Sequence, residues 1–154
     1  MDEHKALIAE LAETIIPRTN TPGAKDVKAQ NFIITLLKNV SDRKTQNSFI
    51  DGLKDIEEFS IDKYEKNFTA LTVIEKRNVV EHFYKKGKNF SGKLGKAKNK
   101  FLGKSFFDIL KNYTTIAYCT SRQGATEGLA YDFIPGKYDA CIALKANQKA
   151  WATK

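Results

Sequence analysis

The sequence has no apolar run long enough to cross a bilayer, since none of its hydrophobic segments approaches the roughly 18 residues of a spanning helix. It begins with the acidic stretch Met1-Asp2-Glu3-His4 and passes directly into a helical pattern, so we expect no signal peptide in this chain. The 154 residues show no internal repeat and no second domain. We therefore predict one domain, residues 1–154.

Histidine and cysteine are scarce, with two of each. His4 and His82 do not form the i, i+4 pair that is typical of a zinc site, and we predict no metal-binding residue. Cys119 and Cys141 lie 22 positions apart without a CxxC motif, which excludes the usual haem-attachment and thiol-redox signatures. Three alternatives stay open for the cysteines: two free thiols, a disulfide between them, or a bond to a partner or a nucleophilic role.

Motifs for phosphate and dinucleotide binding are also missing. No GxGxxG follows a predicted strand, and Gly103-Lys104-Ser105 only superficially resembles a phosphate loop because the GxxxxGK[ST] spacing is not met. Glu57 and Glu58 are neighbours on a helix, where they point about 100° apart and do not converge on one substrate. We predict no catalytic residue and no cofactor-binding residue in this chain.

Positive charge is concentrated in the second half of the chain. Residues 1–84 hold 12 lysines and arginines against 14 acidic residues, whereas residues 85–154 hold 14 against 4. Eight of these lysines fall in residues 85–104. Such an excess is typical of a solvated loop, a polyanionic partner, an acidic protein face or an anionic membrane.

Hydrophobic periodicity predicts an all-α fold, a single helical bundle of about five to six helices. The first helix ends at Pro17, and the second spans about residues 25–40. Ser41-Asp42 offers a cap for a third helix that ends near residues 59–60. A short fourth helix carries Ile61, Tyr64 and Phe68, and a capping box at Thr72 and Glu75 opens the next, which runs to about Lys86. The helix over residues 106–118 is apolar on nearly all sides, which predicts a central position in the bundle.

Two segments lack a helical pattern. Residues 87–104 are rich in glycine and lysine, and we predict a flexible loop. Residues 120–154 are interrupted by glycines and a proline, which predicts an irregular tail. The tail aromatics need a surface to pack against: Tyr131, Phe133 and Tyr138.

Several spaced motifs resemble those of the gluconate 2-dehydrogenase subunit 3 family. Leu11-Ala12-Glu13-Thr14-Ile15-Ile16-Pro17 followed by Thr21-Pro22-Gly23-Ala24 is similar to its N-terminal signature. Phe49-Ile50-Asp51-Gly52-Leu53 and Phe68-Thr69-Ala70-Leu71-Thr72 are similar to its middle helices. Residues 124–132 and Pro135-Gly136-Lys137-Tyr138 resemble its C-terminal loop, although Asp139-Ala140-Cys141-Ile142 departs from the aromatic-rich ending of the family. The resemblance covers nearly the whole chain.

The resemblance implies a small, non-catalytic accessory subunit of a membrane-associated dehydrogenase. FAD is then expected in a large flavoprotein subunit and haem in a cytochrome subunit, with no cofactor in this chain. Such subunits support folding, export or assembly of the flavoprotein and carry a twin-arginine export signal, so the resemblance implies a periplasmic location and only indirect contact with the membrane. We expect no nucleic-acid partner. The alternative is a basic helical nucleic-acid-binding protein that uses the lysines of residues 85–104, but that segment has no arginine and few stacking aromatics.

Two segments without regular helix are the predicted partner-binding surface, because loops present backbone and aromatic groups for docking. The predicted contact residues are Pro22, Gly23, Gly124, Thr126, Tyr131, Pro135, Gly136 and Tyr138. A tail that only covers its own helical core is the competing interpretation. In an oxidising compartment, a Cys119–Cys141 disulfide would hold the tail over the central helix.

Overall fold

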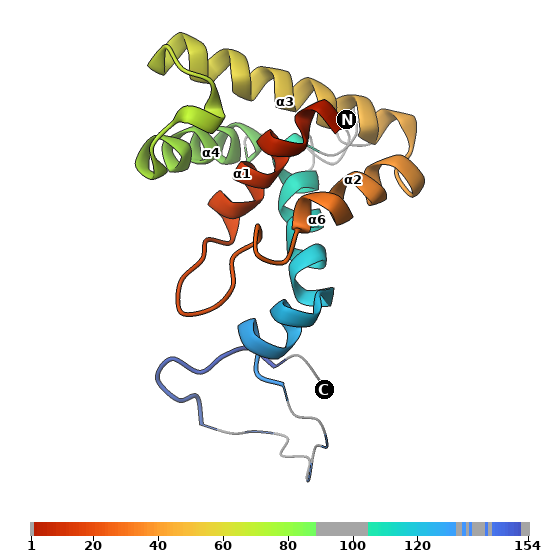
Figure 1. Ribbon diagram of the computed structural model, residues 1–154, viewed down its shortest axis with the longest axis vertical. Coiled ribbons are helices and arrows are strands. Elements are labelled where there is room, and N and C mark those ends of the chain that lie inside the picture. The colour runs from red at the N-terminus through yellow and green to blue at the C-terminus, as the bar shows by residue number, and fades with distance from the viewer. Residues whose placement is uncertain are drawn as a thin grey trace.

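The computed structural model describes residues 2–88, 105–131, 134, 136, 141 and 143–151, without the side chains of residues 2, 87 and 88. Over these residues the chain is a helical bundle, which confirms the predicted all-α class (Figure 1). Its α-helices are α1 (Lys5–Ile15), α2 (Ala29–Asn39), α3 (Arg43–Tyr64), α4 (Val73–Lys88) and α6 (Phe106–Thr120). Shorter helical turns are η1 (Asp2–His4), η2 (Phe68–Ala70) and the π-helical η3 (Gly124–Gly128).

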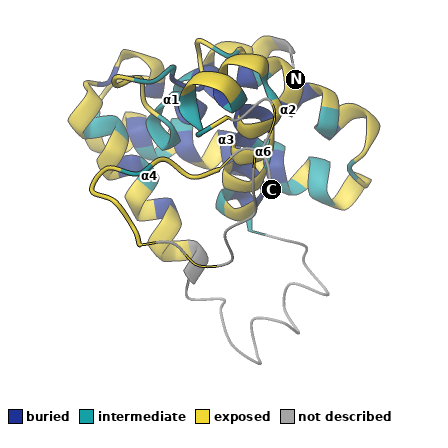
Figure 2. Ribbon diagram, turned by 90° about the horizontal axis from the view of Figure 1, so that it is seen from below, coloured by how far each residue is buried: buried dark blue, intermediate teal, exposed yellow. Residues whose placement is uncertain are grey.

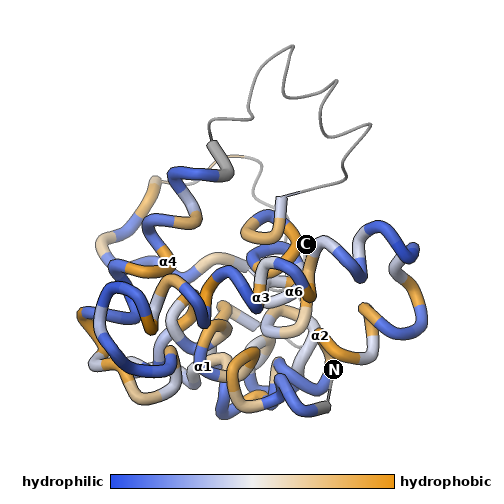
Figure 3. Tube along the Cα trace, turned by 90° about the horizontal axis from the view of Figure 1, so that it is seen from above, coloured by the Kyte–Doolittle hydropathy of each residue, from blue (hydrophilic) through white to orange (hydrophobic). Residues whose placement is uncertain are grey.

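Helix α6 occupies the centre of the bundle, as its apolar character predicts. It contacts α1, α2, α3 and α4, and in Figure 1 it runs down from beneath α3 toward the C-terminal segment. Polar and apolar positions alternate along the outer helices, so that each turns one face to the core (Figure 3). Buried positions accordingly lie on the inner sides of the helices (Figure 2).

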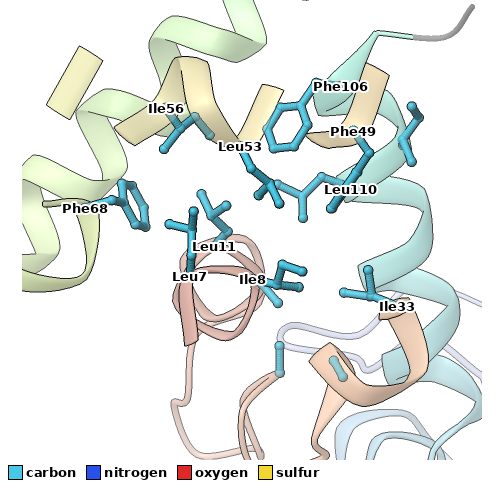
Figure 4. Packing of buried hydrophobic residues seen from close by; sticks show 14 of the residues in the cluster. Leu7, Ile8, Leu11, Ile33, Phe49, Leu53, Ile56, Phe68, Phe106 and Leu110 are labelled. Atoms are coloured by element: carbon cyan, nitrogen blue, oxygen red, sulfur yellow. The ribbon is translucent and has the colours of Figure 1, made fainter. Parts of the chain in front are cut away.

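The core is apolar and closely packed (Figure 4). Phe49 of α3 and Phe106 of α6 lie with ring centroids 5.1 Å apart. Gly52 faces the same ring, because a Cβ at that position would overlap the Phe106 side chain. The glycine inside α3 therefore serves a close helix contact, which outweighs its low helix propensity.

The connector between α1 and α2, residues 16–28, is longer than the sequence predicts. The predicted start of the second helix near Lys25 is wrong, since α2 begins at Ala29 and Lys28 adopts a left-handed conformation with φ 54°. Residues 24–28 form turns instead, and the Ala24 N–H donates to the Ile16 carbonyl over 2.9 Å. Tertiary hydrogen bonds in this connector, described below, outweigh local helix propensity.

Most of the predicted fourth helix is the C-terminal part of α3. Ile61 and Tyr64 belong to α3, which is followed by Glu65 with φ 55°, and only Phe68 lies in the separate turn η2. The predicted break near Ser60 is wrong because Ser60 is buried and its hydroxyl donates to the Ile56 carbonyl over 2.7 Å.

Two predicted caps are confirmed. The Asp42 carboxylate accepts from the Thr45 N–H over 3.0 Å, and hydrogen bonds from Thr45 lower the pKa of this carboxyl group. At the start of α4, the Thr72 N–H donates to Glu75 over 2.8 Å, and the Glu75 N–H donates to the Thr72 hydroxyl over 3.4 Å. Helix α4 continues to Lys88; residues 89–104 of the predicted flexible loop lie outside the described residues. No described helix is both long and apolar enough to span a membrane.

Candidate partner-binding surface

Glu13, in the last turn of α1, binds the backbone of the connector at two positions. One carboxylate oxygen accepts from the Arg18 N–H and the other from the Lys25 N–H, each over 2.8 Å. A negative charge near a helix C-terminus is unfavourable in the field of the helix dipole, but two charge-assisted hydrogen bonds offset that cost. The two ends of residues 18–25 are thereby fixed to the same side chain.

Asp26 holds the interior of the connector. Its carboxylate accepts from the Gly23 N–H over 2.9 Å and from the Arg18 guanidinium over 3.3 Å. Gly23 is buried against the Glu13 carboxylate, and a Cβ at this position would overlap both carboxylate oxygens. The close approach therefore explains the glycine of the Thr21-Pro22-Gly23-Ala24 motif.

Glu10 joins the connector to the bundle. Its carboxylate binds the ammonium of Lys25 over 2.6 Å and that of Lys76, on α4, over 2.9 Å. Partial burial alone would raise the pKa of Glu10, but the hydrogen bonds from the two lysines outweigh it and hold the pKa below its ordinary value. The charged form of Glu10 consequently contributes to stability.

The end of α6 is a tight turn centred on Ser121. The Ser121 hydroxyl donates to the Tyr118 carbonyl over 2.7 Å and accepts from the Gly124 N–H over 3.0 Å. Gly124 is buried so close to the Tyr118 carbonyl that a Cβ would overlap that oxygen. The chain then continues as η3, so the predicted irregular tail from residue 120 is wrong over Gly124–Gly128. The energetic reason is that Ser121 caps a new helical turn.

Tyr118 connects the two segments that the sequence proposes as a surface. Its hydroxyl donates to the Pro22 carbonyl over 2.8 Å, across 96 positions of sequence. Gly128 lies against the ring of the same tyrosine, where a Cβ would overlap the phenol oxygen. The structure thus brings the Pro22-Gly23 turn and η3 into contact with one side chain.

A polar hollow of about 580 Å³ lies between the connector and η3. The connector contributes Asp26, Val27 and Lys28, and the other wall is formed by Ser121, Arg122, Gln123, Thr126 and Glu127. Lys28 and the side chains of Arg122, Gln123, Thr126 and Glu127 are exposed. We name these eight residues the connector–tail surface.

The predicted contact residues divide into two groups. Gly23 and Gly124 are buried and Pro22 is half-buried, so they shape the backbone beneath the surface. Thr126, Tyr131 and Gly136 are exposed. Pro135 and Tyr138 lie outside the described residues.

The last described residues fold back along η3. The Ala130 N–H donates to the Ala150 carbonyl over 2.7 Å, and the Lys149 ammonium donates to the Glu127 carbonyl over 2.6 Å. Of the tail aromatics expected to need a packing surface, Tyr131 is 46% exposed, so about half of it is covered. Phe133 lies outside the described residues, as does Tyr138. Trp151, which forms an isolated bridge with Ala130, is 46% exposed as well.

The sequence interpretation missed three residues that organise this surface: Glu13, Asp26 and Tyr118. Glu13 does carry a signal, because an acidic residue in the last turn of a helix opposes the dipole and needs a specific partner. In the sequence, Tyr118 fits the apolar pattern of its helix like a core residue. Hydrophobic periodicity does not reveal where its hydroxyl group points.

Cys119 and Cys141 are exposed, and the structure contains no bond between them. Their pairing stays a prediction for the protein in an oxidising compartment. Within the described residues, no three histidine, cysteine, aspartate or glutamate side chains gather in a way that could hold a metal ion.

Comparison with known proteins gives one family. A family model described as gluconate 2-dehydrogenase subunit 3 matches residues 2–136, which include the connector, the core helices and η3. No curated protein and no solved structure matches the chain. The chain belongs to the gluconate 2-dehydrogenase subunit 3 family, whose name implies association with the other subunits of a gluconate dehydrogenase complex.

Proposed function

We propose that this chain is a non-catalytic accessory subunit that binds the large, flavin-carrying subunit of a gluconate-dehydrogenase-like oxidoreductase. It supports the folding, export or assembly of that subunit, and the complex works in the periplasm. FAD resides in the large subunit and haem in a cytochrome subunit. Membership of the family supports an association of this kind.

The observation that carries the proposal is the fixed geometry of the connector–tail surface. Glu13 and Asp26 hold the connector through hydrogen bonds to its backbone, and Tyr118 joins it to η3. A loop that is ordered before binding loses less conformational entropy when a partner docks. An accessory subunit that acts as a template for another chain benefits directly from such preorganisation.

The exposed side chains of this surface suit a polar interface. Lys28 and Arg122 offer cations, and Gln123 and Thr126 offer hydrogen-bonding groups. Asp26 is occupied by Arg18 and Gly23, so its charge is largely committed within the connector. Glu127 adds an exposed carboxylate to the same wall, so we expect the partner to present acidic groups to Lys28 and Arg122, a basic group to Glu127, and hydrogen-bonding groups to the hollow.

Co-expression with a large flavoprotein subunit of a gluconate-dehydrogenase-like complex tests the proposal. The wild-type chain should co-purify with that subunit and raise its bound flavin, measured by native mass spectrometry and by flavin absorbance. The double variant Arg122→Glu/Thr126→Trp reverses one charge and fills the hollow, and it should reduce recovery of the complex roughly tenfold. Lys54→Glu, at an exposed position of α3 outside the surface, is the matched control.

Three results contradict the proposal. The first is a flavoprotein that folds and loads flavin equally well without this chain. The second is a complex that tolerates Arg122→Glu/Thr126→Trp as well as it tolerates Lys54→Glu. The third is a purified chain that itself carries stoichiometric flavin or dehydrogenase activity. Binding to nucleic acid that weakens steeply with salt would instead support the alternative function.

A further inference from the structure

A second surface lies where three helices meet. The last turn of α1, one face of α4 and the first turns of α6 line an open groove of about 350 Å³. Helix α4 contributes residues 77, 80, 81 and 84, whose i, i+3, i+4, i+7 spacing places them on one stripe. The groove shares no residue with the connector–tail surface.

The floor of the groove is apolar. Ile15 and Val80 are half-buried and pack against the core. Tyr84 and Phe107 form the adjoining wall, with ring centroids 5.2 Å apart, and Tyr84 remains 37% exposed. Contact between this apolar surface and water is unfavourable, so burying it under another molecule lowers the free energy. An occupant that covers it must therefore bring apolar side chains.

The charges at the rim are predominantly positive. Glu81 forms a solvent-exposed ion pair with Lys85 over 2.7 Å, and the Thr14 hydroxyl already donates to the Glu10 carbonyl. Arg77 and Lys111 are exposed, and within the part of the chain that the structure describes neither side chain has an ion pair. The complementary occupant therefore carries acidic groups beside its apolar ones.

We propose that this groove binds an amphipathic helix of a partner protein, with apolar side chains on the inserted face and Asp or Glu at its edges. The stripe from residue 77 to residue 84 rises about 10 Å, which matches roughly two turns of an inserted helix. A membrane surface would meet the same cations, but it does not fill a concave groove. Nucleic acid would meet them too, but it lacks aliphatic groups for Ile15 and Val80.

This inference goes beyond the proposed function and does not depend on it. A partner helix could belong to the flavoprotein subunit or to another protein, and the connector–tail surface is tested with different variants. Failure of one proposal therefore leaves the other intact.

The test uses the full chain and two labelled, designed helical peptides. The acidic peptide has leucine at i, i+3, i+4 and i+7 with glutamate at the flanking positions, and the basic peptide has lysine in place of each glutamate. Fluorescence anisotropy should show the acidic peptide binding roughly tenfold more tightly than the basic one, with a difference that shrinks in high salt. In the Arg77→Glu/Lys111→Glu variant the preference should reverse.

The matched control is Arg43→Glu/Lys54→Glu, which makes the same change in net charge at exposed positions of α3. It should keep the wild-type preference, and circular dichroism should show that all variants remain helical. Equal binding of both peptides, or no reversal in the groove variant, overturns the proposal. It is also overturned if vesicles rich in phosphatidylglycerol, duplex DNA or a second copy of the chain binds at Arg77 and Lys111 while the acidic peptide does not.

Discussion

The two halves of α6 are held in the protein by different forces. Its N-terminal half is packed by apolar side chains, with Phe106 against Phe49 and Gly52 of α3. Its C-terminal end buries Ala117 and Tyr118 and is held in addition by hydrogen bonds to backbone, from the Tyr118 hydroxyl to Pro22 and from Ser121 to Tyr118. Apolar packing fixes the bundle, whereas directional hydrogen bonds fix the loops that the bundle presents.

The difference has consequences for stability and for function. Apolar burial contributes roughly 1.5–3 kcal/mol for each large side chain, whereas a hydrogen bond contributes a net of about 1 kcal/mol. Damage at the N-terminal half should therefore unfold the whole domain. Damage at the C-terminal end should loosen the connector–tail surface first and leave the bundle folded.

The largest effect is expected at the apolar end. Phe49 is fully buried, so Phe49→Ala leaves a cavity beside Phe106 and should cost about 3–5 kcal/mol of unfolding free energy. Urea denaturation followed by circular dichroism measures the loss. A cost below about 1 kcal/mol would show that apolar packing is not what fixes this half of α6.

Gly52→Ala tests the same contact by adding a group to it, whereas Phe49→Ala removes one. The new methyl group gains up to about 1 kcal/mol of helix propensity but overlaps Phe106, and overpacking costs roughly 1–3 kcal/mol. We expect a net loss in urea denaturation. A smaller side chain at the contact, in Gly52→Ala/Phe106→Leu, should recover part of it, and a stabilising single variant would contradict the close contact.

The Glu10 ion pairs should make the connector sensitive to acid. Because the folded-state pKa of Glu10 lies below its ordinary value of 4.5, the charged pair stabilises the protein above that pH, and the contribution is lost as the pH falls through the lowered pKa. Glu10→Gln should cost about 1–2 kcal/mol at neutral pH, since it leaves Lys76 without its partner.

Thermal unfolding from pH 7 to pH 3 measures this effect. The difference between wild type and Glu10→Gln should shrink as the pH falls below 4.5. Glu58→Gln, at an exposed position of α3, is the control and should change neither the stability nor its pH dependence. A constant difference at all pH values would indicate that packing, and not charge, explains the loss.

Tyr118→Phe removes only the hydroxyl that reaches Pro22. We expect a global cost of about 1 kcal/mol and faster trypsin cleavage at Arg18, Lys25 and Lys28 in the connector. Tyr113→Phe is a matched control on the same helix, because the Tyr113 hydroxyl pairs with Ser41 over 2.7 Å away from the connector. Equal protection of the connector in both variants would contradict the role assigned to Tyr118.

The smallest effect is a gain in stability near the middle of α6. Thr114 is fully buried, and its hydroxyl has no hydrogen-bond partner among the described residues. Thr114→Val replaces that hydroxyl with a methyl group and should stabilise the protein by up to about 1 kcal/mol. Differential scanning calorimetry measures the change, and a loss of stability would show that the hydroxyl has a partner after all.

Helix positions were largely predictable because local signals agree with the final packing. The periodicity of α1 and α6, the cap at Asp42 and the capping box at Thr72 are all confirmed. The errors cluster where a tertiary contact overrides a local preference. The connector delays the start of α2, and burial of Ser60 in the core places it inside a continuous α3 where a break was predicted.

The candidate surface was predictable only in outline. The lack of a helical pattern indicated the Pro22-Gly23 turn and residues 124–138 together as a partner-binding surface. They did not show that the buried glycines provide shape while Lys28 and Arg122 provide exposed charge. Long-range hydrogen bonds between side chains and loop backbone leave no periodic trace in a sequence.

By itself, the sequence determined the helical class, the central place of α6 and the family of the chain, because hydrophobic periodicity and motif spacing are local properties of the polypeptide. Only the tertiary structure decided where the connector ends, how Tyr118 joins residues 96 positions apart, and which charges flank the groove of α1, α4 and α6. Each of these depends on the direction of a particular side chain, which packing sets after the helices have come together.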